Sequence, residues 1–266
     1  MILRPLEPEA PDPSRTGAFV PAWQVVERLQ KRNYESCWMI TQPSHAALAG
    51  QIAAKLNAPQ GSNVTIPELS PDLIRAIAMH DAGWGMPDAQ AVAQSRSSHR
   101  TPPRSFLQTT AAEFVDAWTQ SVHIVQAISP AGGYIVSRHF WRLAEHRLAS
   151  SGDTEADRGR IGHFVEKEAV RQSKLAAKQA RNEKELELLT DLLQFCDLLS
   201  LYICAGAQDN VEFPECFGAK LRLTVQAEGY RLDPPLIAPG TRFSVAALRH
   251  PGTKEVSGME IEIKIG

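Results

Sequence analysis

The sequence predicts a mostly helical protein with a small antiparallel β region at its C-terminal end. Helix start signals and apolar residues at helical spacing recur between residues 21 and 217. Within this region, segment 185–206 is a long apolar run typical of a central helix. Alternation with a period of two begins only after Gly218. We therefore divide the chain into an irregular lead-in (1–20), a helical domain (21–217) and a β appendage (218–266).

Composition limits the class of protein. With 266 residues, 43% of them hydrophobic, the chain can bury a substantial core. The net charge of −2 argues against a general nucleic-acid surface, so we expect no DNA partner. No stretch approaches the ~20 apolar residues that span a bilayer, and the first 20 residues show no signal peptide. The four cysteines lack C-x-x-C spacing, which is typical of reduced thiols in a cytoplasmic protein.

The first part of the helical domain carries one candidate ligand. Residues 22–31 predict a short helix, and 35–41 a short strand or a buried approach segment. A helix then begins at Pro43 or Ser44 and places His45 in its first turn. His45 precedes the apolar stripe of this helix by three residues and can join the interior face. A capping or surface role for His45 remains the alternative.

A second helix runs into an adjacent histidine and aspartate. Ser70 and Pro71 form its start signal. His80 continues the apolar stripe, and Asp81 borders it, before Gly83 and Gly85 end the helix. An imidazole and a carboxylate on an apolar face are costly to bury without a partner, and a divalent metal suits both. A hydrogen-bonded pair or a helix cap is the alternative.

The segment 86–106 is polar and contains proline, which predicts a loop that acts as a lid or a binding segment. It carries three arginines, Arg96, Arg100 and Arg104. A guanidinium group binds phosphate in a bidentate manner, so these residues are candidates for substrate binding. Trp84, just before the loop, is a candidate pocket wall or an ordinary core residue.

Three later helices complete the candidate set. A capping box at Thr110 opens a helix that carries His123, whose neighbours are polar. Ser129 and Pro130 open the next helix, on which His139 shares a face with apolar residues. After a charged helical stretch (155–184), the apolar helix 185–206 carries Asp197 near its middle. A buried carboxylate there needs a metal or an ion pair, for which Arg138 is a candidate.

Neutral imidazoles and carboxylates together suit Mn²⁺, Fe²⁺, Zn²⁺ or Ni²⁺. The order His45, His80-Asp81, Asp197 resembles the H…HD…D pattern of the HD superfamily, and the flanking segments are similar to a bacterial branch of it. The resemblance implies an HD-type helical bundle in which these four residues hold a metal. His123 and His139 correspond to the extra histidine pair of some members, as ligands of a second ion. Ala82 follows the doublet where some nucleotidases have a nearby lysine, and no GYP signature is present.

The resemblance implies a metal-dependent hydrolase that cleaves a phosphoester of a small molecule or nucleotide by metal-activated water, with Asp81 and His80 as catalytic residues. It implies one or two divalent transition-metal ions and a small phosphorylated or polar substrate; a homo-oligomer is possible. A di-iron oxygenase, as in HD proteins with both extra histidines, is the first alternative. A non-catalytic ligand-binding protein on the same scaffold is the second.

Overall fold

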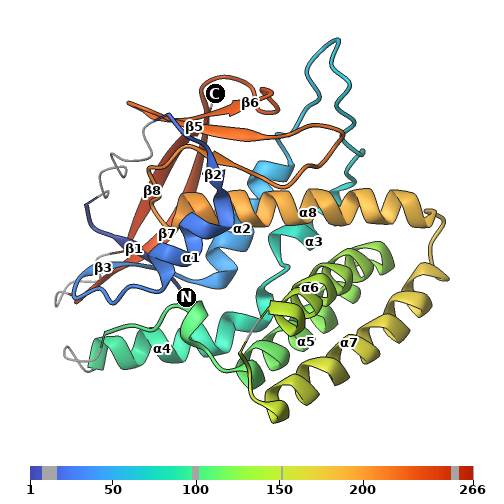
Figure 1. The fold of residues 1–266 in the computed structure, drawn as a ribbon, viewed down its shortest axis with the longest axis horizontal. Coiled ribbons are helices and arrows are strands. Elements are labelled where there is room, and N and C mark those ends of the chain that lie inside the picture. Colours follow the sequence, from blue (N-terminus) through green and yellow to red (C-terminus); the bar gives the residue numbers. More distant parts are fainter. Residues whose placement is uncertain (8–16, 98–101, 151, 253–257, 266) are drawn as a thin grey trace.

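The structure is a computed structural model that describes residues 1–7, 17–97, 102–150, 152–252 and 258–265 (Figure 1). Its helices are α1 (Ala22–Gln30), α2 (Gln42–Ala53), α3 (Pro71–Ala78), α4 (Gly85–Ser97), α5 (Ala111–Gln126), α6 (Pro130–Ser150), α7 (Glu155–Ala176) and α8 (Glu183–Cys204), with 3₁₀ turns η2 (Ala82–Trp84) and η3 (Phe106–Gln108). Its strands are β1 (Ile2–Pro5), β2 (Val20–Pro21), β3 (Cys37–Ile40), β4 (Val211–Glu212), β5 (Arg222–Gln226), β6 (Gly229–Asp233), β7 (Thr241–His250) and β8 (Gly258–Ile265).

The strands form one mixed sheet with the order β1-β3-β7-β8-β6-β5-β4-β2. Two of its neighbouring pairs, β2–β4 and β6–β8, are parallel, and the others are antiparallel. An eight-stranded sheet built from both ends of the chain contradicts the prediction of a helical bundle with a small C-terminal β appendage. The expectation that residues 1–20 are irregular is wrong for Ile2–Pro5, which form an edge strand with Ile2 and Leu3 buried.

The physical reason for this error is the length and pairing of the N-terminal strands. β1 and β3 have four residues each, too few to display a period of two. β3 pairs with β7, where Cys37 lies opposite His250, more than 200 positions away in the chain. No local pattern encodes such a partner, whereas the antiparallel neighbours β5–β6 and β7–β8 are close in sequence and were visible as alternation.

The predicted loop at 86–106 is also wrong in its first half, because Gly85–Ser97 forms helix α4. The segment MPDAQAVAQ is rich in Ala and Gln and carries Pro87 in its first turn, which favours a helix. Arg96 lies on this helix, but its side chain is outside the described part of the structure. Arg100 also lies outside the described residues.

The other predicted helix starts are confirmed. The Ser70 side chain accepts a hydrogen bond from the Leu73 amide at the start of α3. Thr110 and Glu113 form the predicted capping box of α5. α8 begins with a further capping box at Asn182 and runs almost as long as its apolar pattern indicates.

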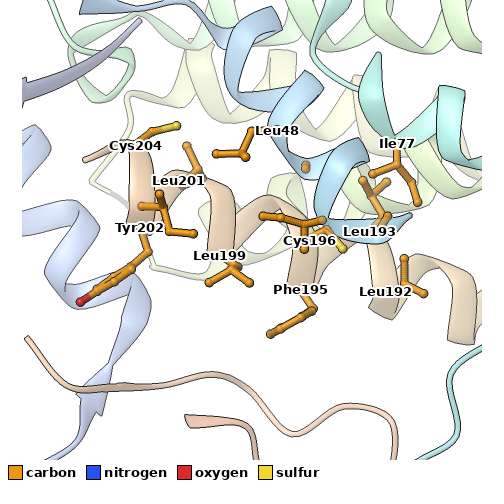
Figure 2. Packing of buried hydrophobic residues seen from close by; sticks show 14 of the residues in the cluster. Leu48, Ile77, Leu192, Leu193, Phe195, Cys196, Leu199, Leu201, Tyr202 and Cys204 are labelled. Carbon is orange, nitrogen blue, oxygen red and sulfur yellow. The ribbon is translucent and has the colours of Figure 1, made fainter. Parts of the chain in front are cut away.

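Helix α8 is the central element of the core. It contacts α1, α2, α6 and β1, and in Figure 1 it runs between the sheet and the group α5, α6 and α7. Figure 2 shows its side chains, among them Leu193 and Cys196, near Leu48 of α2 and Ile77 of α3. The same apolar cluster includes sheet residues such as Leu223, so helices and sheet share one core. None of the helices in the described ranges is long and apolar enough to cross a bilayer.

Candidate metal centre

Five of the predicted ligands meet at one buried point, each held by a different part of the helical body. These residues, the metal-ligand cluster, are His45 in the first turn of α2, His80 and Asp81 after the end of α3, His139 on α6 and Asp197 on α8. Each has at most 8% of its surface exposed. The cluster therefore links helices that are distant in sequence.

Small residues allow these elements to approach closely. A Cβ added at Gly50 of α2 would lie 2.5 Å from the Cβ of Ala78 at the end of α3, so a glycine is needed where these helices touch. Their contact brings the rings of His45 and His80 to a centroid distance of 5.3 Å. A Cβ added at Gly83 would lie 2.1 Å from the carbonyl oxygen of Ala117, so η2 packs directly on the backbone of α5. This second contact fixes the turn that follows Asp81.

Asp197 lies between the three histidines. Its Oδ1 is 3.0 Å from Nε2 of His45 and 3.2 Å from Nε2 of His80. Its Oδ2 is 3.7 Å from Nε2 of His139. Oδ2 of Asp81 is 3.6 Å from Nε2 of His45 and 3.8 Å from Nε2 of His80. All three imidazoles therefore direct the same ring nitrogen, Nε2, toward the carboxylates.

The hydrogen bond at the other side of His80 determines what its Nε2 can do. Nδ1 of His80 lies 2.8 Å from the carbonyl oxygen of Ile77, which can only accept, so Nδ1 carries the proton. In a neutral ring this leaves a lone pair on Nε2, directed at a carboxylate oxygen that also carries only lone pairs. A cation between these atoms removes the repulsion, and a histidine anchored by Nδ1 to a backbone carbonyl is the usual arrangement of a metal ligand.

The charges of the cluster are strongly coupled. Burial disfavours the charged form of His80, but the nearby carboxylates of Asp81 and Asp197 raise the pKa of His80 to about 9. Burial raises the pKa of Asp81, despite the opposing effect of His80 and His45. Although burial opposes it, hydrogen bonds from His45 and His80 hold the pKa of Asp197 well below its usual range. Burial lowers the pKa of His139 to about 4, so this ring is neutral. The carboxylates thus call for positive charge at this point.

The donor set fits a divalent transition metal. Two overlapping groups, His45–His80–Asp81 and His80–His139–Asp197, each place their ligand atoms within 4.8 Å of one another. In the described part of the chain, the buried Nδ1 atoms of His45 and His139 have no hydrogen-bond partner, so these rings are held for the contact at Nε2. Three imidazoles and two carboxylates suit Mn²⁺, Fe²⁺, Ni²⁺ or Zn²⁺ better than Mg²⁺.

The cluster forms the floor of a cavity of about 910 Å³. Asp81, His139 and Asp197 line this cavity, while His45 and His80 lie behind them with no exposed surface. Trp84 lines the cavity and is also 98% buried, so both interpretations of this residue from the sequence apply. A molecule in the cavity can therefore reach the two carboxylates and His139.

The structure does not bring the remaining predicted residues to the cluster. His123 is exposed on α5 and contacts Arg171 of α7 at 3.0 Å. Arg104 is exposed, forms an ion pair with Glu113 at 3.7 Å and is not among the residues that line the cavity. Arg138, the alternative partner of Asp197, forms an ion pair with Glu187.

The sequence analysis missed the aromatic lining of the cavity. Phe114 and Trp118 of α5 line it together with Phe140 of α6, next to His139. The four-residue spacing of Phe114 and Trp118 places both rings on one face of α5, which was the available signal.

Comparisons with known proteins identify a family. The model of the family described as "Protein of unknown function (DUF3891)" matches residues 29–234, which include all five residues of the metal-ligand cluster. Neither the search of curated proteins nor the search of solved structures gives a match. Because the match covers more than half of the sequence, the chain belongs to the DUF3891 family.

Proposed function

We propose that the protein is a metal-dependent hydrolase that cleaves a phosphoester of a small molecule, with His45, His80, Asp81, His139 and Asp197 holding one or two divalent transition-metal ions. The observation that carries the proposal is the convergence of three Nε2 atoms on two buried carboxylates at the floor of a cavity. The H…HD…D order of these residues, which resembles the HD superfamily, supports the same reaction class.

The residues divide the work by position. His45 and His80 are fully buried and act as ligands only, with His80 fixed by its bond to the Ile77 carbonyl. Asp81 and Asp197 face the cavity, where the carboxylate of Asp81 can take up the proton that an attacking water loses. A bound divalent ion supplies a water of lowered pKa and positive charge for the phosphoryl oxygens. Trp84 packs edge-on against Phe114 at a centroid distance of 5.2 Å and excludes bulk water from this side.

The two alternatives receive less support. The oxygenase was suggested by two extra histidines, and His139 joins the cluster whereas His123 contacts Arg171 instead. A non-catalytic binding protein requires no cavity-facing carboxylates, and two are present. Hydrolysis therefore remains the proposal.

The test is activity of the metal-stripped full-length protein after addition of Mn²⁺, Fe²⁺, Ni²⁺ or Zn²⁺, with p-nitrophenyl phosphate as substrate. We expect one of these ions to restore phosphate release, and Asp81→Asn to reduce it by ~100-fold or more because it removes both charge and a proton acceptor. His123→Ala is the matched control and should retain full activity. Equal rates for the parent and Asp81→Asn, or no release with any of the four ions, would contradict the phosphohydrolase proposal.

A further inference from the structure

The cavity above the metal-ligand cluster has an aromatic wall, which we define as Trp84, Phe114, Trp118 and Phe140. The rings form a continuous series, with centroid distances of 5.2 Å from Trp84 to Phe114, 5.2 Å from Phe114 to Trp118 and 5.5 Å from Trp118 to Phe140. Phe140 is adjacent to His139, and their ring centroids lie 5.1 Å apart. The wall therefore leads directly to a residue of the cluster.

Further rings line the cavity from other elements. They are Trp23 of α1, Phe106 of η3, Phe195 of α8 and Phe213 after β4. Three of these rings are buried, whereas Trp23 is 37% exposed and packs on Phe106 at 6.4 Å. Aromatic rings from the helices and from the segment after β4 thus line the same space.

The charged side chains that line the cavity are largely neutralised by one another. Lys31 lies 2.9 Å from Glu27, and Arg147 lies 2.7 Å from Asp153. Asp191 accepts from Arg142 at 2.7 Å. Among the described residues, the cavity therefore offers a phosphate group no unpaired lysine or arginine. The positive charge for an anionic group comes from the metal centre alone, which suits one such group and not a polyphosphate chain.

We propose that the substrate has a flat, ring-containing apolar body that stacks against the aromatic wall, and a single anionic head at the metal centre. This inference rests on the proposed function for the role of the head group. The volume of about 910 Å³ is in the range of sites for drug-sized molecules and leaves room for a fused ring system. Burial against eight aromatic side chains supplies the affinity, and the cluster at one end supplies the orientation.

The experiment measures binding of stable phosphonates to the metal-loaded protein by isothermal titration calorimetry. The probes are 1-naphthylmethylphosphonate, which carries a fused ring, methylphosphonate, which has the same head without the ring, and AMP. We expect the naphthyl compound to bind at least about tenfold more tightly than methylphosphonate, since one ring stacked on aromatic side chains contributes on the order of a factor of ten. We also expect it to bind more tightly than AMP.

Variants connect this preference to the cavity. Trp118→Leu should remove most of the naphthyl preference, and Trp23→Ala, at a partly exposed position, should reduce it about threefold, with recovery in Trp23→Phe. Met86→Ala changes an apolar side chain that is 70% exposed and does not line the cavity, so it should have no effect. Circular dichroism and metal content verify that each variant is folded and loaded.

The outcomes separate this inference from the proposed function. Equal affinity for the naphthyl compound and methylphosphonate, in a protein that retains its metal, would overturn the apolar substrate while leaving the hydrolase proposal intact. Tighter binding of AMP would overturn it in favour of a nucleotide. A naphthyl preference in a protein that fails to hydrolyse any phosphoester would support the apolar pocket and remove the reaction class.

Discussion

His139 and His123 lie on two helices in contact, α6 and α5, and their surroundings differ in every property that favours metal binding. His139 is 2% exposed and directs Nε2 toward the carboxylate of Asp197. His123 is exposed and borders a groove between α5 and α7 that is lined by Arg160, Lys167 and other charged residues. A histidine becomes a ligand where burial and a carboxylate coincide, and a surrounding of cations has the opposite effect.

The strongest way to break this comparison is to remove the carboxylate that lies among the three histidines. Asp197→Asn keeps the shape of the side chain but removes the charge, so we expect the affinity for a divalent metal to fall by roughly 100-fold or more. Titration of metal-free protein with Zn²⁺ against a competing chelator measures it. Asp191→Asn, on the same helix but paired with Arg142, is the control and should bind as the parent does.

Removing one histidine should have a smaller effect, since four ligands remain. We expect His139→Ala to weaken metal binding by ~10–100-fold and His123→Ala to leave it unchanged. The same competition titration applies to both variants. A loss in His123→Ala as large as in His139→Ala would show that the groove, and not the buried cluster, holds the ion.

The metal should also stabilise the fold, because the cluster connects α2, α3, α6 and α8. At a free ion concentration 100 times the Kd, binding to the native state adds ~2.7 kcal/mol to the free energy of unfolding. For a protein of this size this raises the Tm by ~5–10 °C. Differential scanning calorimetry with and without a chelator measures the shift, and the Asp197→Asn variant, which has lost the site, should show none.

The packing that positions the cluster gives the smallest effect. Gly83→Ala places a methyl group against the backbone of α5 and should cost ~1–3 kcal/mol of stability. Gly85→Ala adds the same group two residues further on, where no atom lies within 4 Å, and should change stability by less than ~0.5 kcal/mol. Urea unfolding of both variants provides the measurement. Equal stability in the two would mean that η2 is free to move away from α5.

The sequence predicted the ligand positions better than the architecture. His45, His80, Asp81, His139 and Asp197 could be found because polar residues on otherwise apolar helix faces stand out against a clear helical pattern. Whether they meet depends on how the helices cross, and that is set by contacts such as Gly50 against Ala78, which a single sequence does not reveal.

The sheet could not be predicted in the same way. The four-residue strands Ile2–Pro5 and Cys37–Ile40 are too short to show a period, and their pairing with each other and with β7 depends on distant parts of the chain. Helix α4 was missed because proline and serine outweighed its alanines and glutamines in the interpretation of residues 86–106. The signals that failed were therefore those that depend on tertiary contacts or on a balance of weak local preferences.

The most direct test of the central claim is elemental analysis of protein purified without a chelator or an affinity tag, beside the double variant His80→Ala/Asp81→Ala. The account predicts about one or two transition-metal ions per chain in the parent and none in the variant, with both proteins folded by circular dichroism. Absence of metal from the parent, even after incubation with Mn²⁺, Fe²⁺, Ni²⁺ and Zn²⁺, or equal metal content in the two proteins, would contradict it.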